Sequence, residues 1–88
     1  MTYVVCDESE GLRDSEATVG VLDLDGRRRY LRVEKHFLDR GNGHSYLPVG
    51  VVYRDLEGRK ALIEFPHEAD SGENRVWVDL ADLKESRA

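Results

Sequence analysis

The sequence has few of the residues on which many protein classes depend. Its 88 residues include one cysteine, Cys6, so neither an internal disulfide nor a thiolate zinc cluster is available. No apolar run approaches the length of a membrane span, and no basic flank precedes the short apolar segment at the N-terminus. We therefore expect no signal peptide, no membrane partner and a cytoplasmic location.

The motifs of enzyme chemistry are also missing. The chain has no glycine-rich phosphate loop, no nucleophile elbow and no pair of histidines at helical spacing. Cys6 lies in a strand-forming run, residues 2–6, where a free cysteine is usually a small buried hydrophobe. Apart from the presence of these residue types, nothing supports a catalytic pair of Cys6 with a histidine. We expect no enzymatic activity and no cofactor.

The charge is acidic and the length suits one small domain. Eighteen acidic and 13 basic residues give a net charge of −5, which argues against a general nucleic-acid binder. The hydrophobic fraction of 40% and the charged fraction of 35% fit one modest core with much solvated surface. We predict a single domain, residues 1–88, with a mobile acidic loop at residues 7–16 and a frayed tail at residues 84–88.

The longest strand-forming stretch spans residues 46–65 and folds on itself at Asp55-Leu56-Glu57-Gly58. Alternating apolar residues on both sides of this turn predict a β-hairpin. A three-residue loop would end on Gly58, which takes a positive φ without strain, and would pair Asp55 with Arg59. The predicted register places three apolar pairs on one face: Tyr53 with Ala61, Val51 with Ile63, and Val49 with Phe65.

A second hairpin is predicted over residues 17–34, around Asp23-Leu24-Asp25-Gly26. The same type of loop pairs Val19 with Leu31 and Ala17 with Val33. Its turn resembles that of residues 55–59, which fits either an old duplication or convergence on the same turn residues.

Short strands with turns every eight to twelve residues predict an all-β fold. We expect an SH3-like barrel of about five to six short antiparallel strands, with an open β-sandwich as the alternative. The layout resembles SH3-like barrels in its long first loop, two central hairpins and a Val-Trp-Val-x-x-x-x-Leu ending at residues 76–83. The Val-Gly-Val starts and the Leu-Pro-Val segment at residues 47–49 are similar to PRC-barrel domains.

These resemblances carry different implications for function. The PRC-type resemblance implies a role in assembly or RNA-processing complexes. Signalling SH3 domains have an Ala-Leu-Tyr-Asp-Tyr start, a tryptophan pair and a Pro-x-x-Tyr ending, and this sequence has none of them. Recognition of proline-rich segments is therefore not carried over.

One basic cluster is a candidate binding surface. Arg28, Tyr30 and Arg32 alternate and would share one face of a strand. Arginine beside an exposed aromatic residue is a composition that binds single-stranded nucleic acid. Alternatively, the arginines pair with Asp23, Asp25 and the acidic loop and protect an edge strand from aggregation. The negative net charge favours this second interpretation.

Trp77 and the histidines complete the candidate sites. Trp77 either packs in the core or, beside Tyr30 or Tyr46, marks a contact surface, because tryptophan and tyrosine are enriched in binding hot spots. His67 and Asp70 share a polar loop and are weak candidates for metal ligands, since their spacing matches no known motif. We expect no bound metal.

The sequence therefore favours a non-catalytic protein-interaction module that binds a protein partner or forms a homo-oligomer, through strand edges and the acidic loop. One alternative is an RNA- or ribosome-associated accessory protein that uses the basic strand. Another is a metal- or small-ligand-binding domain.

Overall fold

A computed structural model describes residues 1–85 of the chain. The fold is all-β, with 60% of residues in strands and 7% in helices, which confirms the predicted class. Two three-residue strands, β4 and β8, add to the six strands expected. The elements in chain order are β1 (Thr2–Glu10), β2 (Glu16–Leu22), β3 (Arg28–Glu34), η1 (Lys35–Phe37), β4 (Asp39–Gly41), β5 (His44–Asp55), β6 (Lys60–Glu64), β7 (Arg75–Asp79), η2 (Leu80–Asp82) and β8 (Leu83–Glu85).

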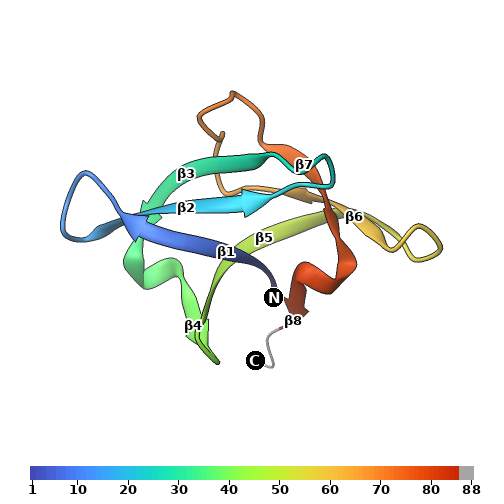
Figure 1. Ribbon diagram of the computed structural model, residues 1–88, viewed down its shortest axis with the longest axis horizontal. Helices are drawn as coiled ribbons and strands as arrows, with labels where there is room; N and C mark the ends of the chain where they lie inside the picture. The colour runs from blue at the N-terminus through green and yellow to red at the C-terminus, as the bar shows by residue number, and fades with distance from the viewer. Residues whose placement is uncertain (86–88) are drawn as a thin grey trace.

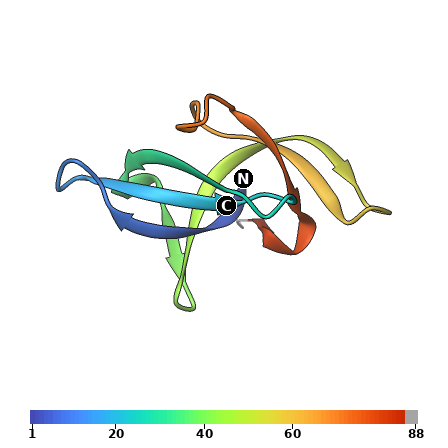
Figure 2. The same cartoon turned by 45° about the horizontal axis from the view of Figure 1, so that its top comes forward.

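The strands form one antiparallel sheet in the order β3-β2-β1-β5-β6-β7, with β4 beside β5 and β8 beside β1. The sheet curls into a half-barrel, as Figures 1 and 2 show. β1 joins its two halves, because residues 2–6 pair with β5 and residues 7–10 pair with β2. The meander β1–β2–β3 thus faces the meander β5–β6–β7 across the core. No helix within residues 1–85 is long and apolar enough to cross a membrane.

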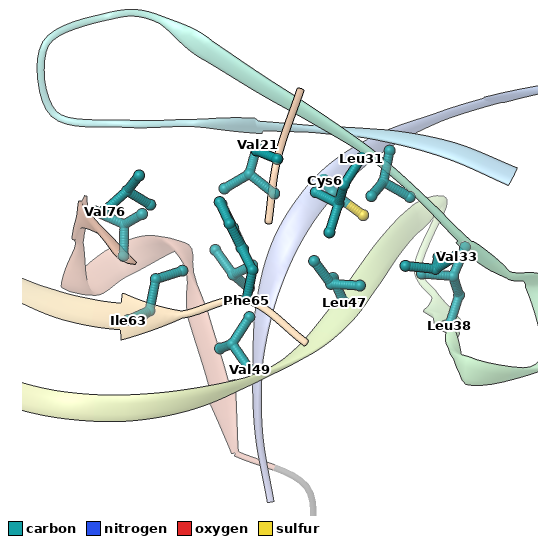
Figure 3. Close-up of a cluster of buried hydrophobic side chains, with 14 of the residues drawn as sticks. Cys6, Val21, Leu31, Val33, Leu38, Leu47, Val49, Ile63, Phe65 and Val76 are labelled. Carbon is teal, nitrogen blue, oxygen red and sulfur yellow. The ribbon is translucent and has the colours of Figure 1, made fainter. Parts of the chain in front are cut away.

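The core fills the concave side of the curled sheet. Alternate residues of both meanders point inward, and Val4, Leu31, Leu47 and Ile63 are fully buried. Phe65, 3% exposed, follows β6, and Figure 3 shows its ring between Val21 of β2 and Val49 of β5. The remaining buried apolar residues are Cys6, Ala17, Val19, Val33, Leu38, Ala61, Ala69, Val76 and Val78.

The predicted register of the first hairpin is confirmed. Val19 pairs with Leu31 and Ala17 pairs with Val33 in the β2–β3 ladder. Gly26 has a φ of 80°, the left-handed conformation that the predicted loop requires of its last residue. The alternation of apolar residues and the turn residues predict the same register here, so the local sequence was sufficient to predict this hairpin.

The predicted register of the second hairpin is correct on one side of Val52 and wrong on the other. Val51 pairs with Ile63 as expected, but Tyr53 pairs with Leu62 instead of Ala61, and Asp55 pairs with Lys60 instead of Arg59. The register shifts between Val51 and Tyr53, so Val52 is the extra residue of a β-bulge. The loop is one residue longer than predicted, and Arg59, with a φ of 53°, takes the left-handed conformation in place of Gly58.

Two predicted irregular segments are partly strand. Residues 7–10 of the expected acidic loop pair with β2, so only residues 11–15 form the connection. Gly11 closes it by donating its N–H to the Glu16 carbonyl at 3.2 Å, and a Cβ there would lie 2.6 Å from that same oxygen.

The expected frayed tail also begins later than predicted. Leu83–Glu85 forms β8, because the free edge of β1 offers pairing partners from Thr2 to Val4. The rest of that tail, residues 86–88, lies outside the described residues.

Candidate interaction surface

The convex face of β5, β6 and β7 carries a row of apolar side chains. Tyr53 pairs with Leu62, and Leu62 pairs with Trp77, so the three residues lie side by side across three strands. Their neighbours Ile63, Val76 and Val78 point the other way and are buried. Tyr53 is 59% exposed and Trp77 is 36% exposed, which places both on the surface. Of the two interpretations of Trp77, the exposure favours the contact surface.

The bulge at Val52 enlarges this row. Regular alternation after Val51 would turn Tyr53 inward, as the sequence predicted. Because the bulge inserts one residue, Val52 and Tyr53 are both exposed, Val52 by 43%. We call the four residues Val52, Tyr53, Leu62 and Trp77 the outer patch.

The aromatic rings of the outer patch are held in place by their neighbours. The Tyr53 and Trp77 rings meet edge to face, with centroids 6.2 Å apart and planes at 80°. Lys60 places its Nζ 4.9 Å from the Trp77 ring centroid, a cation–π distance. Ordered aromatic rings lose little side-chain entropy on binding, which favours their use as anchors of an interface.

Charged residues flank the outer patch on both sides along the strands. One flanking row consists of Asp55, Lys60 and Asp79, which pair across β5, β6 and β7. The other row consists of Gly50, Glu64 and Arg75, in which Arg75 Nε donates to Glu64 Oε1 at 2.8 Å. An apolar centre with a charged rim is the usual anatomy of a protein interface.

The predicted basic surface lies on β3, away from the outer patch, and its charges are paired. Arg28 forms an ion pair with Asp7, and Arg32 forms one with Asp70. Tyr30 is 46% exposed, and its ring lies over Gly20, where a Cβ would be 3.0 Å from the ring. The structure therefore does not bring Trp77 together with Tyr30.

The edge of β3 is covered by the loop between β6 and β7. Asp70 donates its backbone N–H to the Tyr30 carbonyl at 2.8 Å, and His67 Nε2 lies 2.7 Å from the Arg32 carbonyl oxygen. Arg29 adds ion pairs to Asp23 at 2.9 Å and to Glu73 at 3.0 Å. The loop therefore engages the two carbonyls of Tyr30 and Arg32 and partly covers this edge.

The weak metal candidates His67 and Asp70 are engaged with other groups. The two ring nitrogens of His67 lie 3.1 Å and 2.7 Å from the carbonyl oxygens of Glu68 and Arg32. The Asp70 carboxylate is paired with Arg32. Within residues 1–85 no cluster of three or more histidine, cysteine or acidic residues has the geometry to hold a metal ion.

Cys6 lies in the core and is a poor nucleophile. Burial, with the nearby carboxylates of Glu8 and Asp7, raises the pKa of its thiol to about 12. The thiol therefore stays protonated at neutral pH, and a protonated thiol neither attacks substrates nor binds metals well.

A second surface feature is a groove at one end of the half-barrel, with a volume of about 840 Å³. Its walls include Tyr3, Phe37, Pro48 and Phe65, and Phe37 is 56% exposed. Glu34 also lines it, and its Oε2 atom makes no hydrogen bond but forms an ion pair with Arg13, another lining residue, at 3.9 Å. The groove thus combines an apolar wall with a carboxylate whose ion pair with Arg13 is long.

Sequence reasoning wrongly placed Tyr53 on the core face, and it did not single out Val52 and Leu62, which alternation puts on the opposite face, as part of a contact surface. The usable signal was the unbroken run Val51-Val52-Tyr53, in which strict alternation leaves the apolar Val52 on the solvent-facing side. Such a run at the convex side of a curled sheet is compatible with a bulge.

Comparison with known proteins identifies no relative of this chain. No family model, no curated protein and no solved structure matches it. The surface chemistry of the chain itself is therefore the basis for proposing its function.

Proposed function

We propose that this chain is a non-catalytic, cytoplasmic protein-interaction module that binds its partner through the outer patch. The observation that carries the proposal is the row Tyr53–Leu62–Trp77, in which exposed Tyr53 and Trp77 flank half-buried Leu62 across three strands. Isolated apolar residues are common on protein surfaces, but contiguous aromatic and aliphatic groups are typical of contact sites. The sequence suggested strand edges and the acidic loop instead; the partly covered edge of β3 and the pairing of residues 7–10 favour the sheet face.

The proposal is tested by capturing binding partners with immobilised protein and comparing two variants. Trp77→Ser removes the largest anchor of the outer patch. Tyr30→Ser removes an aromatic residue of similar exposure on a different face, and it is the matched control. We expect a partner that binds wild type and Tyr30→Ser protein but is lost, by tenfold or more, with Trp77→Ser, as for an interface hot spot.

Folding must be intact in both variants for this comparison. Circular dichroism and thermal melting of each variant check it, and both substituted side chains lie on solvent-facing sides of the sheet. A set of bound proteins that is the same for wild type and Trp77→Ser protein would contradict the proposal.

A second candidate function is the binding of a small ligand in the groove. The apolar wall and the Glu34 Oε2 atom, which makes no hydrogen bond and lies 3.9 Å from the Arg13 guanidinium, favour a ligand with an apolar body and a hydrogen-bond donor, such as an amine. Screening apolar amines by NMR and comparing Glu34→Gln protein tests this candidate. Shifts that stay the same in the Glu34→Gln variant, or no shifts in wild-type protein, would contradict it.

A further inference from the structure

We propose that the partner of the outer patch is a second copy of the same chain, packed face to face about a two-fold axis that runs across the strands. The inference rests on the proposed function and specifies the partner and its orientation. It follows from the register of β5, β6 and β7, which fixes the order of charges around the patch.

Three rows of outward-facing residues define this surface. The apolar row Tyr53–Leu62–Trp77 lies in the middle. The row Asp55–Lys60–Asp79 lies at one side, and the row Gly50–Glu64–Arg75 lies at the other. Lys60 and Glu64 are both two residues from Leu62 on β6, so the two charged rows are equally far from the apolar row.

Two copies that pack aligned sheets face to face have two choices of two-fold axis. With an axis parallel to the strands, each row faces the same row of the partner, and β5 faces the partner's β7. Lys60 then faces the partner's Lys60, and Asp55 faces the partner's Asp79. These are contacts between like charges, which disfavour this arrangement.

The second choice is an axis perpendicular to the strands, in the plane between the two sheets. Each charged row then faces the other charged row of the partner. Lys60 then faces the partner's Glu64, and Asp79 faces the partner's Arg75. Both contacts repeat by symmetry, so four pairs of opposite charge surround the apolar row. Trp77 meets the partner's Trp77, and Leu62 meets the partner's Leu62. The charge pattern of the patch is therefore complementary to itself in one orientation.

The charges of the rim also favour a second copy of the chain over a partner whose surface carries charges of one sign. The rim carries two positive residues, Lys60 and Arg75, among three negative residues. A uniformly basic or acidic surface would leave one of these sets facing like charges. A second copy matches both positive residues and two of the three negative ones, and it leaves Asp55 opposite the uncharged Gly50 of the partner.

The size of the face sets the expected strength of the dimer. Three strands about 4.8 Å apart, each with five residues at about 3.3 Å per residue, cover roughly 14 by 17 Å. Stable complexes bury about 800 Å² per partner, well above this face. We therefore expect a reversible dimer that forms as the protein concentration rises.

Sedimentation velocity from roughly 10 µM to 1 mM protein, where small interfaces assemble, tests the inference. We expect a shift from monomer to dimer with wild-type protein and with Tyr30→Ser. Lys60→Glu and Glu64→Lys should each weaken self-association about tenfold, because each places like charges opposite each other twice. An equal mixture of the two variants should dimerise again, since the carboxylate introduced in one variant then faces the ammonium group introduced in the other.

The mixture separates an interface from a folding defect. Lys60→Glu adds a third carboxylate to the row of Asp55 and Asp79, so its stability is checked by thermal melting. A misfolded variant cannot recover association through a complementary charge on a second chain. A mixture that stays as monomeric as its components would overturn the proposed orientation.

Wild-type protein that is monomeric over the whole range would overturn self-pairing. If a different protein is still captured in a Trp77-dependent manner, the outer patch remains an interaction surface and only the identity of its partner changes. Failure of both experiments contradicts the interaction module itself.

Discussion

The two hairpins of this protein have almost the same turn sequence but different turns. Asp-Leu-Asp-Gly-Arg at residues 23–27 closes the first hairpin with Gly26 left-handed, at a φ of 80°. Asp-Leu-Glu-Gly-Arg at residues 55–59 closes the second with Arg59 left-handed, at a φ of 53°. The bulge at Val52 accounts for the difference, because it moves the closing pair from Asp55–Arg59 to Asp55–Lys60. Turn residues alone therefore do not fix the register of a hairpin.

The first residue of each turn has a different environment. Asp23 is 8% exposed, and its Oδ1 accepts the N–H groups of Asp25 and Arg27, both at 2.9 Å. Its Oδ2 pairs with Arg29 at 2.9 Å. Asp55 is less buried, and its Oδ1 accepts the N–H of Gly58 at 2.9 Å. The first turn is thus tied to the protein interior, whereas the second projects into solvent.

This contrast predicts unequal costs for the same substitution. Asp23→Ala should destabilise the protein by about 3 kcal/mol, because it leaves the nearly buried guanidinium of Arg29 without one of its carboxylates and two N–H groups without an acceptor. Asp55→Ala, the matched control, should cost about 1 kcal/mol, the value of one partly exposed hydrogen bond. Urea denaturation of both variants at pH 7 measures the difference, and equal costs would contradict the assigned environments.

The cost of Asp23→Ala should also depend on pH. Burial alone would raise the pKa of the Asp23 carboxyl, but the Arg27 N–H, the Arg29 guanidinium and the Asp25 N–H outweigh burial and hold this pKa below its usual value. A carboxyl whose pKa is lowered on folding stabilises the protein above its unfolded pKa, and this contribution is lost as pH falls through the folded pKa. The gap between wild type and Asp23→Ala should therefore be full at pH 6 and narrow below about pH 4.

Urea titrations at several pH values measure this gap. Other carboxylates are common to wild type and variant, so their titration cancels in the difference. A gap that stays constant from pH 6 to about pH 3 would show that the ionised carboxylate contributes nothing.

Removing the bulge tests its role in the second hairpin directly. Deletion of Val52 should restore regular alternation while keeping Val51 opposite Ile63 and Tyr53 opposite Leu62. Because the ladder is retained on both sides, the free energy of unfolding should change by about 1 kcal/mol or less. Cross-strand NOEs between backbone protons report the register. A hairpin in which Tyr53 moves opposite Ala61 would show that Val52 does not determine the pairing.

The contrast between the hairpins also shows what the sequence could predict. The first hairpin was predictable because its turn and its alternation lead to the same register, from Ala17 to Val33. In the second, Val51-Val52-Tyr53 is compatible with more than one register, and the choice depends on packing of Ile63 and Ala61 in the core. The candidate binding residues show the same dependence on local sequence. Arg28, Tyr30 and Arg32 share one face of β3, and alternation within that single strand was enough to predict it.

The outer patch was harder to predict, because it joins residues from three strands. Tyr53 and Trp77 become neighbours across β6, and the bulge puts Tyr53 on the convex face. The pairing of Arg32 with Asp70 likewise depends on a loop 38 residues away along the chain. Such contacts arise from how the sheet curls, which periodicity within one strand does not specify.

The smallest expected effect concerns the left-handed residue of each turn. Arg59 has a φ of 53°, a conformation in which a non-glycine residue is strained, so Arg59→Gly should stabilise the protein by about 0.5 kcal/mol. The relief of strain is partly offset by the greater freedom of glycine in the unfolded chain. Arg27→Gly, at the corresponding position of the first turn, should instead destabilise slightly, because Gly26 already supplies the left-handed conformation there. Thermal melts of the two variants compare them, and stabilisation by Arg27→Gly as large as that by Arg59→Gly would mean that the two turns do not differ in this way.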